Sequence, residues 1–263
     1  MATAPGSRTK REVDYPTSDG KPMAETGLHW QVMVDVVETL RDYFAAEPMV
    51  YVGGNLLLFY EEGNRRKHVA PDAFMTRGIP KFPLRDYYLL WKEGKPPDVV
   101  IETTSKTTKR EDQKTKRVLY RDVLKIPEYF QFDPTEDYLN PSLRGVRRVG
   151  DEYVTIELVD GRLPSVNLGL HLERSGEELR FWDPVRGSWL LTREEQRDIA
   201  QQRALQEAQR ADLQKQRADA AEQRQAIERQ ADAVARHHLE AENERLRREL
   251  EAIRHKLSGE HRD

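Results

Sequence analysis

The C-terminal part of the chain lacks helix-breaking residues over a long stretch, and this strongly limits what it can form. After Thr192 neither proline nor glycine occurs until Gly259, and Ala, Glu, Gln and Arg dominate the composition. Proline and glycine are the residues that most often end helices, whereas these four types favour them. The sequence therefore predicts a single helix over residues 193–257, about 100 Å long at ~1.5 Å per residue.

The apolar residues near the end of this helix follow a heptad spacing. Upstream, the tripeptide Gln-Arg-Ala recurs every seven residues, at 202, 209 and 216. Asn243 falls at an a position of this heptad pattern. A buried asparagine at such a position favours a parallel pair of helices, so we expect a parallel coiled-coil homodimer. The alternative is a solvated single helix with charge pairs four residues apart. The a and d positions are Leu239, Asn243, Leu246, Leu250, Ile253 and Leu257.

Composition and charge exclude several classes of protein. The chain has a net charge of −3, and the predicted helix balances 14 basic with 14 acidic residues, so it is not expected to be a DNA-binding arm. The sequence has no cysteine, which leaves no thiolate metal site and fits a reducing cytoplasm. No run approaches the ~20 apolar residues that span a bilayer. We expect a cytoplasmic protein that does not contact membranes.

Turn signals and hydrophobic periodicity divide the chain into four parts. Residues 1–20 are polar and predict a mobile arm, 21–192 a globular domain, 193–257 the coiled coil and 258–263 a tail. Within the domain we predict a helix over 24–44 and a second over 111–125, with strands before, between and after them. This order predicts an α/β (α+β) domain with a mixed central sheet. The predicted strand segments are MVYVGG, NLLLFYE, HVAPDAFMT, PDVVIETT, EYFQFDP, RRVGDEYVTIELV, LRFWDP and GSWLLT.

The segment PPDVVIETTSKTT, residues 96–108, carries the first candidate site residues. Side chains alternate along a strand, so Asp98, Glu102 and Thr104 share one face, with Asp98 and Glu102 about 13 Å apart. That separation is too large for the two acids to hold one metal ion together. A second acid must come from a neighbouring strand, and Asp72 in HVAPDAFMT is the best candidate because Pro71 limits ladder pairing there. Such oxygen ligands suit Mg²⁺ or Mn²⁺.

The helix predicted over 111–125 supplies a candidate cation. Asp112, Lys116 and Tyr120 are four residues apart, so they lie along one helix face that could pack on the sheet. A lysine near the two acids could orient a water or stabilise charge on a phosphate. By spacing alone, salt-bridge and capping roles for these residues remain the alternative. Basic residues that could contact a nucleic-acid backbone are Lys106, Lys109, Arg110, Lys114 and Arg117.

Residues 102–134 resemble the core of the Uma-two-type proteins. These are a former domain of unknown function that is widespread in bacteria, and they are assigned to the PD-(D/E)XK restriction-endonuclease-like superfamily. The resemblance covers roughly residues 20–192 and does not include the coiled coil. The residues that match the family pattern are Pro71, Asp72, Glu102, Ser105, Asp112, Lys116, Tyr120, Pro127, Glu128, Tyr129, Asp133 and Pro134.

The resemblance implies a restriction-endonuclease-like fold and a metal-dependent nuclease acting on nucleic acid, which we expect to be DNA. By this resemblance Asp72 and Glu102 bind the metal, with the Thr103 carbonyl as a third ligand. The lysine that usually follows two residues after the glutamate is replaced by Thr104, and Lys116 would take its role from the helix. The competing class is a catalytically inactive nuclease fold that acts as a scaffold through its coiled coil.

His29 is a further polar residue, on the first predicted helix. It could approach the site, but we expect it to belong to the polar face of that helix.

Overall fold

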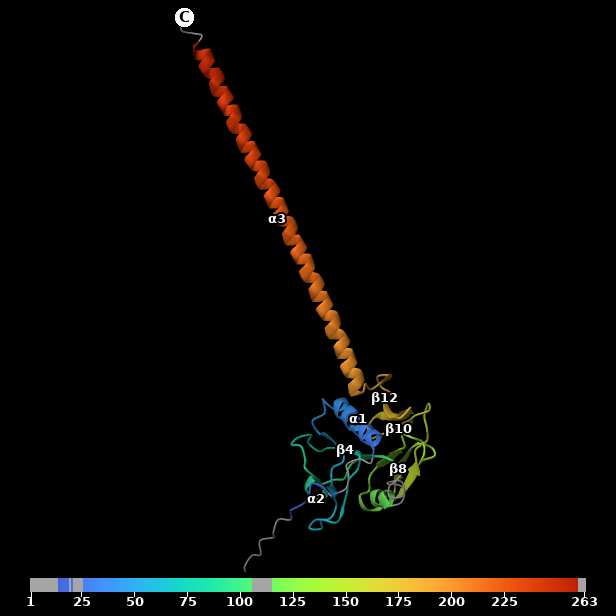
Figure 1. The fold of residues 1–263 in the computed structure, drawn as a ribbon. Coiled ribbons are helices and arrows are strands. Elements are labelled where there is room, and N and C mark those ends of the chain that lie inside the picture. Colours follow the sequence, from blue (N-terminus) through green and yellow to red (C-terminus); the bar gives the residue numbers. More distant parts are fainter. Residues whose placement is uncertain (1–13, 19, 21–25, 106–114, 260–263) are drawn as a thin grey trace, which may run out of the picture. The chain divides into compact units, whose positions relative to one another are not determined.

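The computed structural model describes residues 14–18, 20, 26–105 and 115–259 of the chain, with side chains described up to residue 252 (Figure 1). It divides into two compact units, the first ending at Gln196 and the second beginning at Arg197. The first unit contains the sheets, and the second consists of the long C-terminal helix.

The first unit is organised around a six-stranded mixed sheet with the strand order β1-β4-β6-β7-β8-β9. β6 and β7 are parallel, and the other neighbours are antiparallel. β6 lies between β4 and β7, and each of its five residues is buried. The predicted mixed α/β core is therefore confirmed. The strands are β1 (Val50–Gly53), β4 (Ala73–Arg77), β6 (Val99–Thr103), β7 (Glu128–Phe132), β8 (Leu143–Val149) and β9 (Glu152–Thr155).

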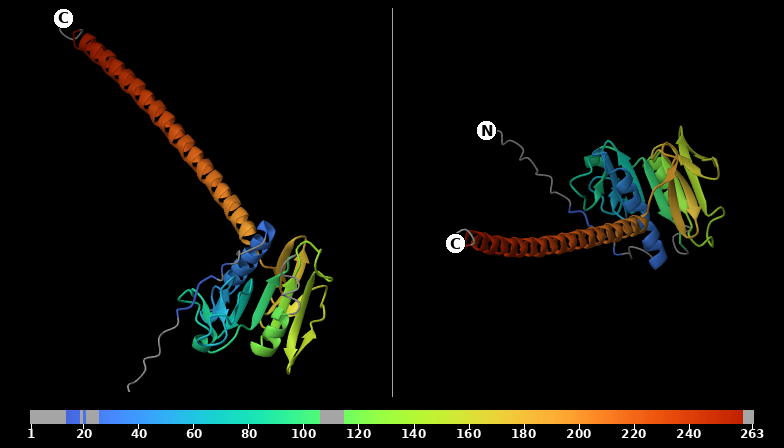
Figure 2. Two further views of the ribbon diagram at one scale, coloured as in Figure 1. Left: turned by 60° about the horizontal axis from the view of Figure 1, so that its bottom comes forward. Right: turned by 90° about the horizontal axis from the view of Figure 1, so that it is seen from above.

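One face of this sheet packs against α1 (Gly27–Tyr43) and a second, four-stranded sheet. Thr26 caps α1 by accepting a hydrogen bond from the backbone N–H of His29, 3.1 Å away. The apolar stripe of α1 is buried against the strands, and Figure 2 shows the helix lying along them. The second sheet contains β10 (Leu163–Ser165), β11 (Leu170–Ser175), β12 (Glu178–Asp183) and β13 (Ser188–Trp189).

The other face carries a small three-stranded sheet, the short helix α2 (Leu90–Glu93) and a helical segment that begins at Thr115 among the described residues. This segment includes the π-helix η2 (Leu119–Val123) and stops before Lys125. Of the helix predicted over 111–125, residues 111–114 lie outside the described residues. The small sheet contains β2 (Leu58–Phe59), β3 (His68–Val69) and β5 (Tyr88–Leu89).

The predicted strand HVAPDAFMT is two strands in the structure. β3 joins the small sheet and β4 joins the large one. Pro71 lies between them and has no N–H to donate, so the ladder is interrupted there. As a result Asp72 lies directly before the first residue of β4.

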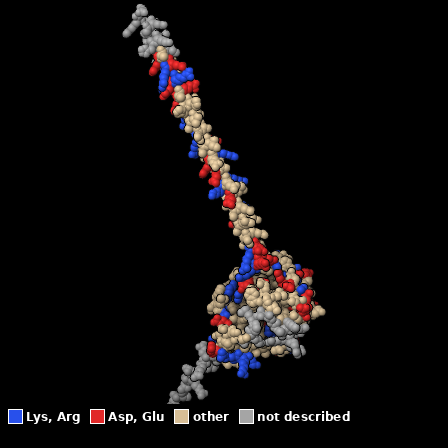
Figure 3. All heavy atoms as spheres, viewed as in Figure 1, with Lys and Arg blue, Asp and Glu red and all other residues tan. Residues whose placement is uncertain are grey.

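The second unit is almost entirely α3 (Arg193–Gly259), close to the predicted bounds. Basic and acidic side chains are interspersed along α3 on the face shown in Figure 3. Across the described part of the chain, no helix is both long enough and apolar enough to span a membrane.

Glu128 joins the large sheet to the segment after β10. Its side chain has 0% exposure and accepts a hydrogen bond from Arg147 at 2.8 Å. The Ser165 hydroxyl donates at 2.6 Å, and the backbone N–H groups of Val166 and Asn167 donate at 3.0 and 3.1 Å. Loss of the carboxylate would leave the Ser165 hydroxyl and two backbone N–H groups without their acceptor, and the Arg147 guanidinium, 35% exposed, without its partner. Donors that lose their acceptor in a buried place are destabilising.

We therefore expect Glu128→Ala to lower the free energy of unfolding by about 2–4 kcal/mol, chiefly through the donors that lose their acceptor, measured by urea denaturation. Glu152→Ala is the matched control, because Glu152 is 74% exposed in its ion pair with Arg121. That variant should change stability by about 0–1 kcal/mol. Equal effects of the two substitutions would contradict the role given to Glu128.

Candidate active site

Asp72 and Glu102 are neighbours because of the register between β4 and β6. Ala73 pairs with Ile101, so the next residue outward, Asp72, lies opposite Glu102. The Thr103 N–H donates a hydrogen bond to Asp72 Oδ2 at 2.7 Å, and the Asp72 N–H approaches Glu102 Oε2 at 3.4 Å. These two contacts hold both carboxyl groups at the same edge of the sheet, where β4 begins and the antiparallel strand β6 ends.

The helical segment after residue 115 supplies donors to Glu102. Lys116 Nζ lies 2.9 Å from Glu102 Oε2, and the Tyr120 hydroxyl donates to Oε1 at 2.5 Å. The Lys116 side chain is 12% exposed and that of Glu102 is 0% exposed. A carboxylate so buried needs a cation and hydrogen-bond donors. Lys116 and Tyr120, four residues apart, supply both from one helix face.

His29 was assigned to the polar face of its helix, and this expectation was wrong. The residue is buried, and its Nε2 lies 3.2 Å from Asp72 Oδ2. An ionised carboxylate can only accept, so Nε2 is the donor in this contact. The partner is 43 residues further along the chain, and helical spacing alone carries no information about such a contact.

The surroundings of Asp72 favour its ionised form. Burial by itself would raise the pKa of Asp72, but the hydrogen bond from His29, the charge of Lys116 and the Thr103 N–H outweigh it. Together they hold the pKa of this carboxyl group below its usual value. Asp72 is therefore a carboxylate at neutral pH, as a metal ligand must be.

Other predicted site residues lie elsewhere or outside the described part of the chain. Asp98 is at the opposite end of the strand, where it accepts from the Arg77 N–H at 2.7 Å and pairs with Lys95 at 2.9 Å. Thr104, two residues after Glu102, is buried. Arg117, predicted to contact nucleic acid, has its guanidinium carbon 5.8 Å from the ring centre of Tyr153. The predicted residues outside the described ranges are Asp112, Lys106, Lys109, Arg110 and Lys114.

The donor chemistry of the site fits a hard divalent cation. Asp72 and Glu102 offer carboxylate oxygens, and the Thr103 carbonyl belongs to the same strand end. Mg²⁺ is commonly held by one or two carboxylates together with water and substrate phosphate. Within the described residues, however, no group of three or more His, Asp or Glu side chains is placed to hold a metal ion. Two carboxylates are thus the acidic ligands that these residues provide.

Asp72 and Glu102 lie on neighbouring strands of a mixed sheet, and Lys116 lies beside Glu102. Two carboxylates with an adjacent lysine are the kind of arrangement used in metal-assisted hydrolysis. A family model, Uma2, described as "Putative restriction endonuclease", matches residues 5–176. The chain therefore belongs to the Uma2 family, as the resemblance in the sequence implied.

A search of solved structures gives a more distant similarity. The chain is similar to a crystal structure of a "putative nuclease belonging to DUF820" from Anabaena variabilis ATCC 29413. The identity is 18% and the TM-score 0.40, over 56% of this chain and 78% of the other. No protein with a curated description matches the chain.

The lowered pKa of Asp72 predicts how stability depends on pH. An unfolded aspartate has a pKa of about 3.9. Because the folded value is lower, ionised Asp72 stabilises the fold above that pH, and this contribution is lost as the pH falls through the folded pKa. We expect the free-energy difference between wild type and Asp72→Asn to shrink below about pH 4, measured by urea unfolding across pH.

Asp35→Asn serves as a control with the opposite sign. Burial raises the pKa of Asp35, despite the hydrogen bond that Gln31 donates at 3.0 Å. Ionised Asp35 therefore destabilises the fold at neutral pH, and acidification through its folded pKa relieves this effect. The same pH trend in both comparisons would contradict the assignment for Asp72.

Proposed function

We propose that this chain is a metal-dependent endonuclease that hydrolyses phosphodiester bonds of nucleic acid, with DNA as the expected substrate. Membership of the Uma2 family supports the nuclease class. The observation that carries the proposal is the group formed by Asp72, Glu102 and Lys116. The Asp72 N–H approaches Glu102 Oε2 at 3.4 Å, the Asp72 carboxylate accepts from the Thr103 N–H at 2.7 Å, and the lysine lies 2.9 Å from Glu102. An acid pair with an adjacent cation suits a reaction that develops negative charge on a phosphate.

Each residue has a distinct proposed task. Asp72 and Glu102 would hold Mg²⁺ or Mn²⁺, with the Thr103 carbonyl as a further ligand. When bound, such an ion activates water and neutralises charge on the phosphate. Lys116 would orient the attacking water or stabilise that charge, and Tyr120 would fix the Glu102 carboxylate through its 2.5 Å hydrogen bond. His29 would keep Asp72 in position through the contact at 3.2 Å.

A scaffold without activity is the second candidate, and one observation favours it. Asp72 and Glu102 both receive hydrogen bonds from protein groups, and no cluster of three metal-ligating side chains occurs among the residues that the structure describes. In this alternative Lys116 takes the place of a metal permanently, and the protein works through its long helix.

The nuclease proposal predicts cleavage that depends on Mg²⁺ or Mn²⁺ and stops with EDTA. Asp72→Asn and Glu102→Gln should abolish cleavage, because each removes a charged oxygen ligand from the metal. Lys116→Ala should reduce the rate by about 10²–10⁴-fold, the usual range for a positioned proton-transfer or orienting group. The measurement is cleavage of single-stranded and duplex DNA and RNA, with circular dichroism of each variant to show that it is folded.

Asp151→Asn is the matched acidic control, because the Asp151 side chain is 94% exposed. It should cleave like wild type. Equal activity in wild type and all three site variants would identify a contaminating nuclease. The scaffold alternative predicts no cleavage and no binding of Mg²⁺ or Mn²⁺ by calorimetry.

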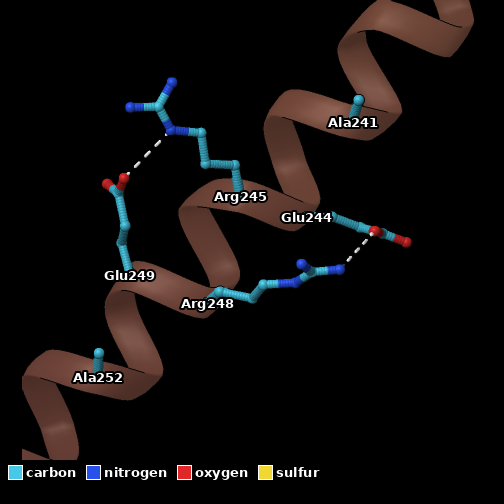
Figure 4. A pocket seen from close by; sticks show the side chains of 6 residues that line it. All are labelled: Ala241, Glu244, Arg245, Arg248, Glu249 and Ala252. Carbon is cyan, nitrogen blue, oxygen red and sulfur yellow. Dashed lines mark hydrogen bonds and ion pairs between the residues drawn. The ribbon is translucent and has the colours of Figure 1, made fainter.

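We further propose that α3 pairs with the same helix of a second copy as a parallel coiled coil. The side chains of Leu239, Leu246 and Leu250 are exposed along it. The ion pairs Arg245–Glu249 and Arg248–Glu244, at 3.2 and 3.4 Å, use positions outside this apolar seam. They border the surface pocket in Figure 4, which contains no leucine. Charge on one face and leucines on another is the pattern of a coiled-coil helix.

This pairing predicts a dimer of the full chain by light scattering and a monomer after truncation. The truncation belongs after Gln196, because Arg193 pairs with Glu38 and Gln196 donates to Asp42 at 3.2 Å, both within the first unit. Asn243→Leu should raise the thermal midpoint and loosen the choice of oligomer, since a buried asparagine limits register at some loss of stability. A full-length monomer at micromolar concentration would refute the pairing.

A further inference from the structure

A second group of polar side chains continues the row that Glu102 begins across the sheet. Gln131 on β7 is paired with Glu102, and Arg144 on β8 is paired with Gln131. Cross-strand partners on adjacent strands share one face of a sheet. Three successive strands therefore place a carboxylate, an amide and a guanidinium side by side on the face that also receives Lys116.

The buried side-chain amide of Gln131 has a hydrogen-bond partner for its oxygen but none for its nitrogen among the described residues. It is 2% exposed, and its Oε1 accepts a hydrogen bond from Arg144 Nε at 2.9 Å. Its Nε2 is buried and has no hydrogen-bond partner among the described residues, and the same holds for Oγ1 of Thr104, which directly follows β6. Buried polar atoms are rarely left unsatisfied, and those that are call for an explanation such as a ligand.

The charges at this place point to an anion. Burial, together with the charge of Arg117, lowers the pKa of Arg144. The structure pairs neither arginine with a carboxylate within the described ranges. Two neighbouring guanidinium groups that have no carboxylate partner among the described residues are stabilised by a bound anion, and a phosphate fits the guanidinium fork through two parallel hydrogen bonds.

We propose that Arg144 and Arg117 bind a backbone phosphate of the substrate, next to the phosphodiester that would be cleaved at the metal site proposed for Asp72 and Glu102. Gln131 positions the Arg144 guanidinium through Oε1, and its Nε2 supplies a further donor. This inference rests on the proposed nuclease function, because it assigns the substrate contact of the same site. It makes nucleic-acid binding in the absence of metal depend on the arginines, one of which is on β8.

The test is binding of a fluorescein-labelled DNA oligonucleotide, single-stranded and duplex, in EDTA, followed by anisotropy over a series of NaCl concentrations. Arg144→Met should raise the Kd by about 10-fold and reduce the salt slope by about one, as expected for the loss of one phosphate contact. Arg148→Met is the matched control, because it removes the same charge from the same strand and face, at the end where Arg148 pairs with Asp151. It should leave the Kd within about 2-fold of wild type.

Gln131→Glu separates a binding role from a structural one. Glutamate keeps the acceptor for Arg144 Nε, and its charge neutralises the arginine, so DNA binding should weaken at least as much as in Arg144→Met. Thermal unfolding of each variant reports the structural effect separately. Unchanged binding by Arg144→Met and Gln131→Glu, or no DNA binding by wild type, overturns the subsite.

The two proposals fail in different ways. Binding that depends on Arg144, without cleavage in Mg²⁺ or Mn²⁺, would remove the nuclease activity and leave the phosphate subsite standing. Metal-dependent cleavage that Asp72→Asn abolishes, with Arg144→Met binding and cutting like wild type, would remove the subsite and leave the nuclease.

Discussion

The burial of Glu102 at the end of the central strand determines much of the first unit. Its side chain is fully buried, and its two carboxylate oxygens accept from Lys116, Tyr120 and the Asp72 N–H. An uncompensated carboxylate in this position would be strongly destabilising. The helical segment after residue 115 must therefore pack over β6, and β4 must keep its register. A slip of one residue would place Ile101 where Glu102 belongs and turn the carboxylate to the opposite face.

The sequence alone predicts the features of this site that depend on residues a few positions apart. Alternation along PPDVVIETT predicts which side chains share a face, and the spacing of Lys116 and Tyr120 predicts that both lie on one helix face. Pro71 predicts that ladder pairing is limited next to Asp72, which in the structure lies directly before β4, although the sequence predicts the segment HVAPDAFMT as one strand. These inferences succeed because each depends on residues a few positions apart, where the periods of strand and helix fix directions.

The remainder of the site depends on contacts between distant segments, and periodicity cannot predict those. His29 reaches Asp72 across 43 positions. Gln131 and Arg144 join the row only through the registers of β7 with β6 and β8. Asp98 shares the strand face of Glu102, yet it pairs with Lys95 near the strand's start. The π-turns of η2 have no distinguishing sequence pattern, because they differ from an α-helix only in hydrogen-bond spacing.

Charge balance connects the stability of the site with its proposed chemistry. Asp72, Glu102 and Lys116 together carry one net negative charge when the acids are ionised and the lysine is protonated. In the proposed function a divalent cation would reverse that charge, and the single negative charge of a phosphodiester would then bring the total to zero. Neither ligand alone gives neutrality in a largely buried site, so each should favour binding of the other. Lys116 lies 2.9 Å from Glu102 and neutralises it in the structure. In the proposed function a bound metal would take over that task and Lys116 would become available to the phosphate, so one residue would serve folding and catalysis in turn.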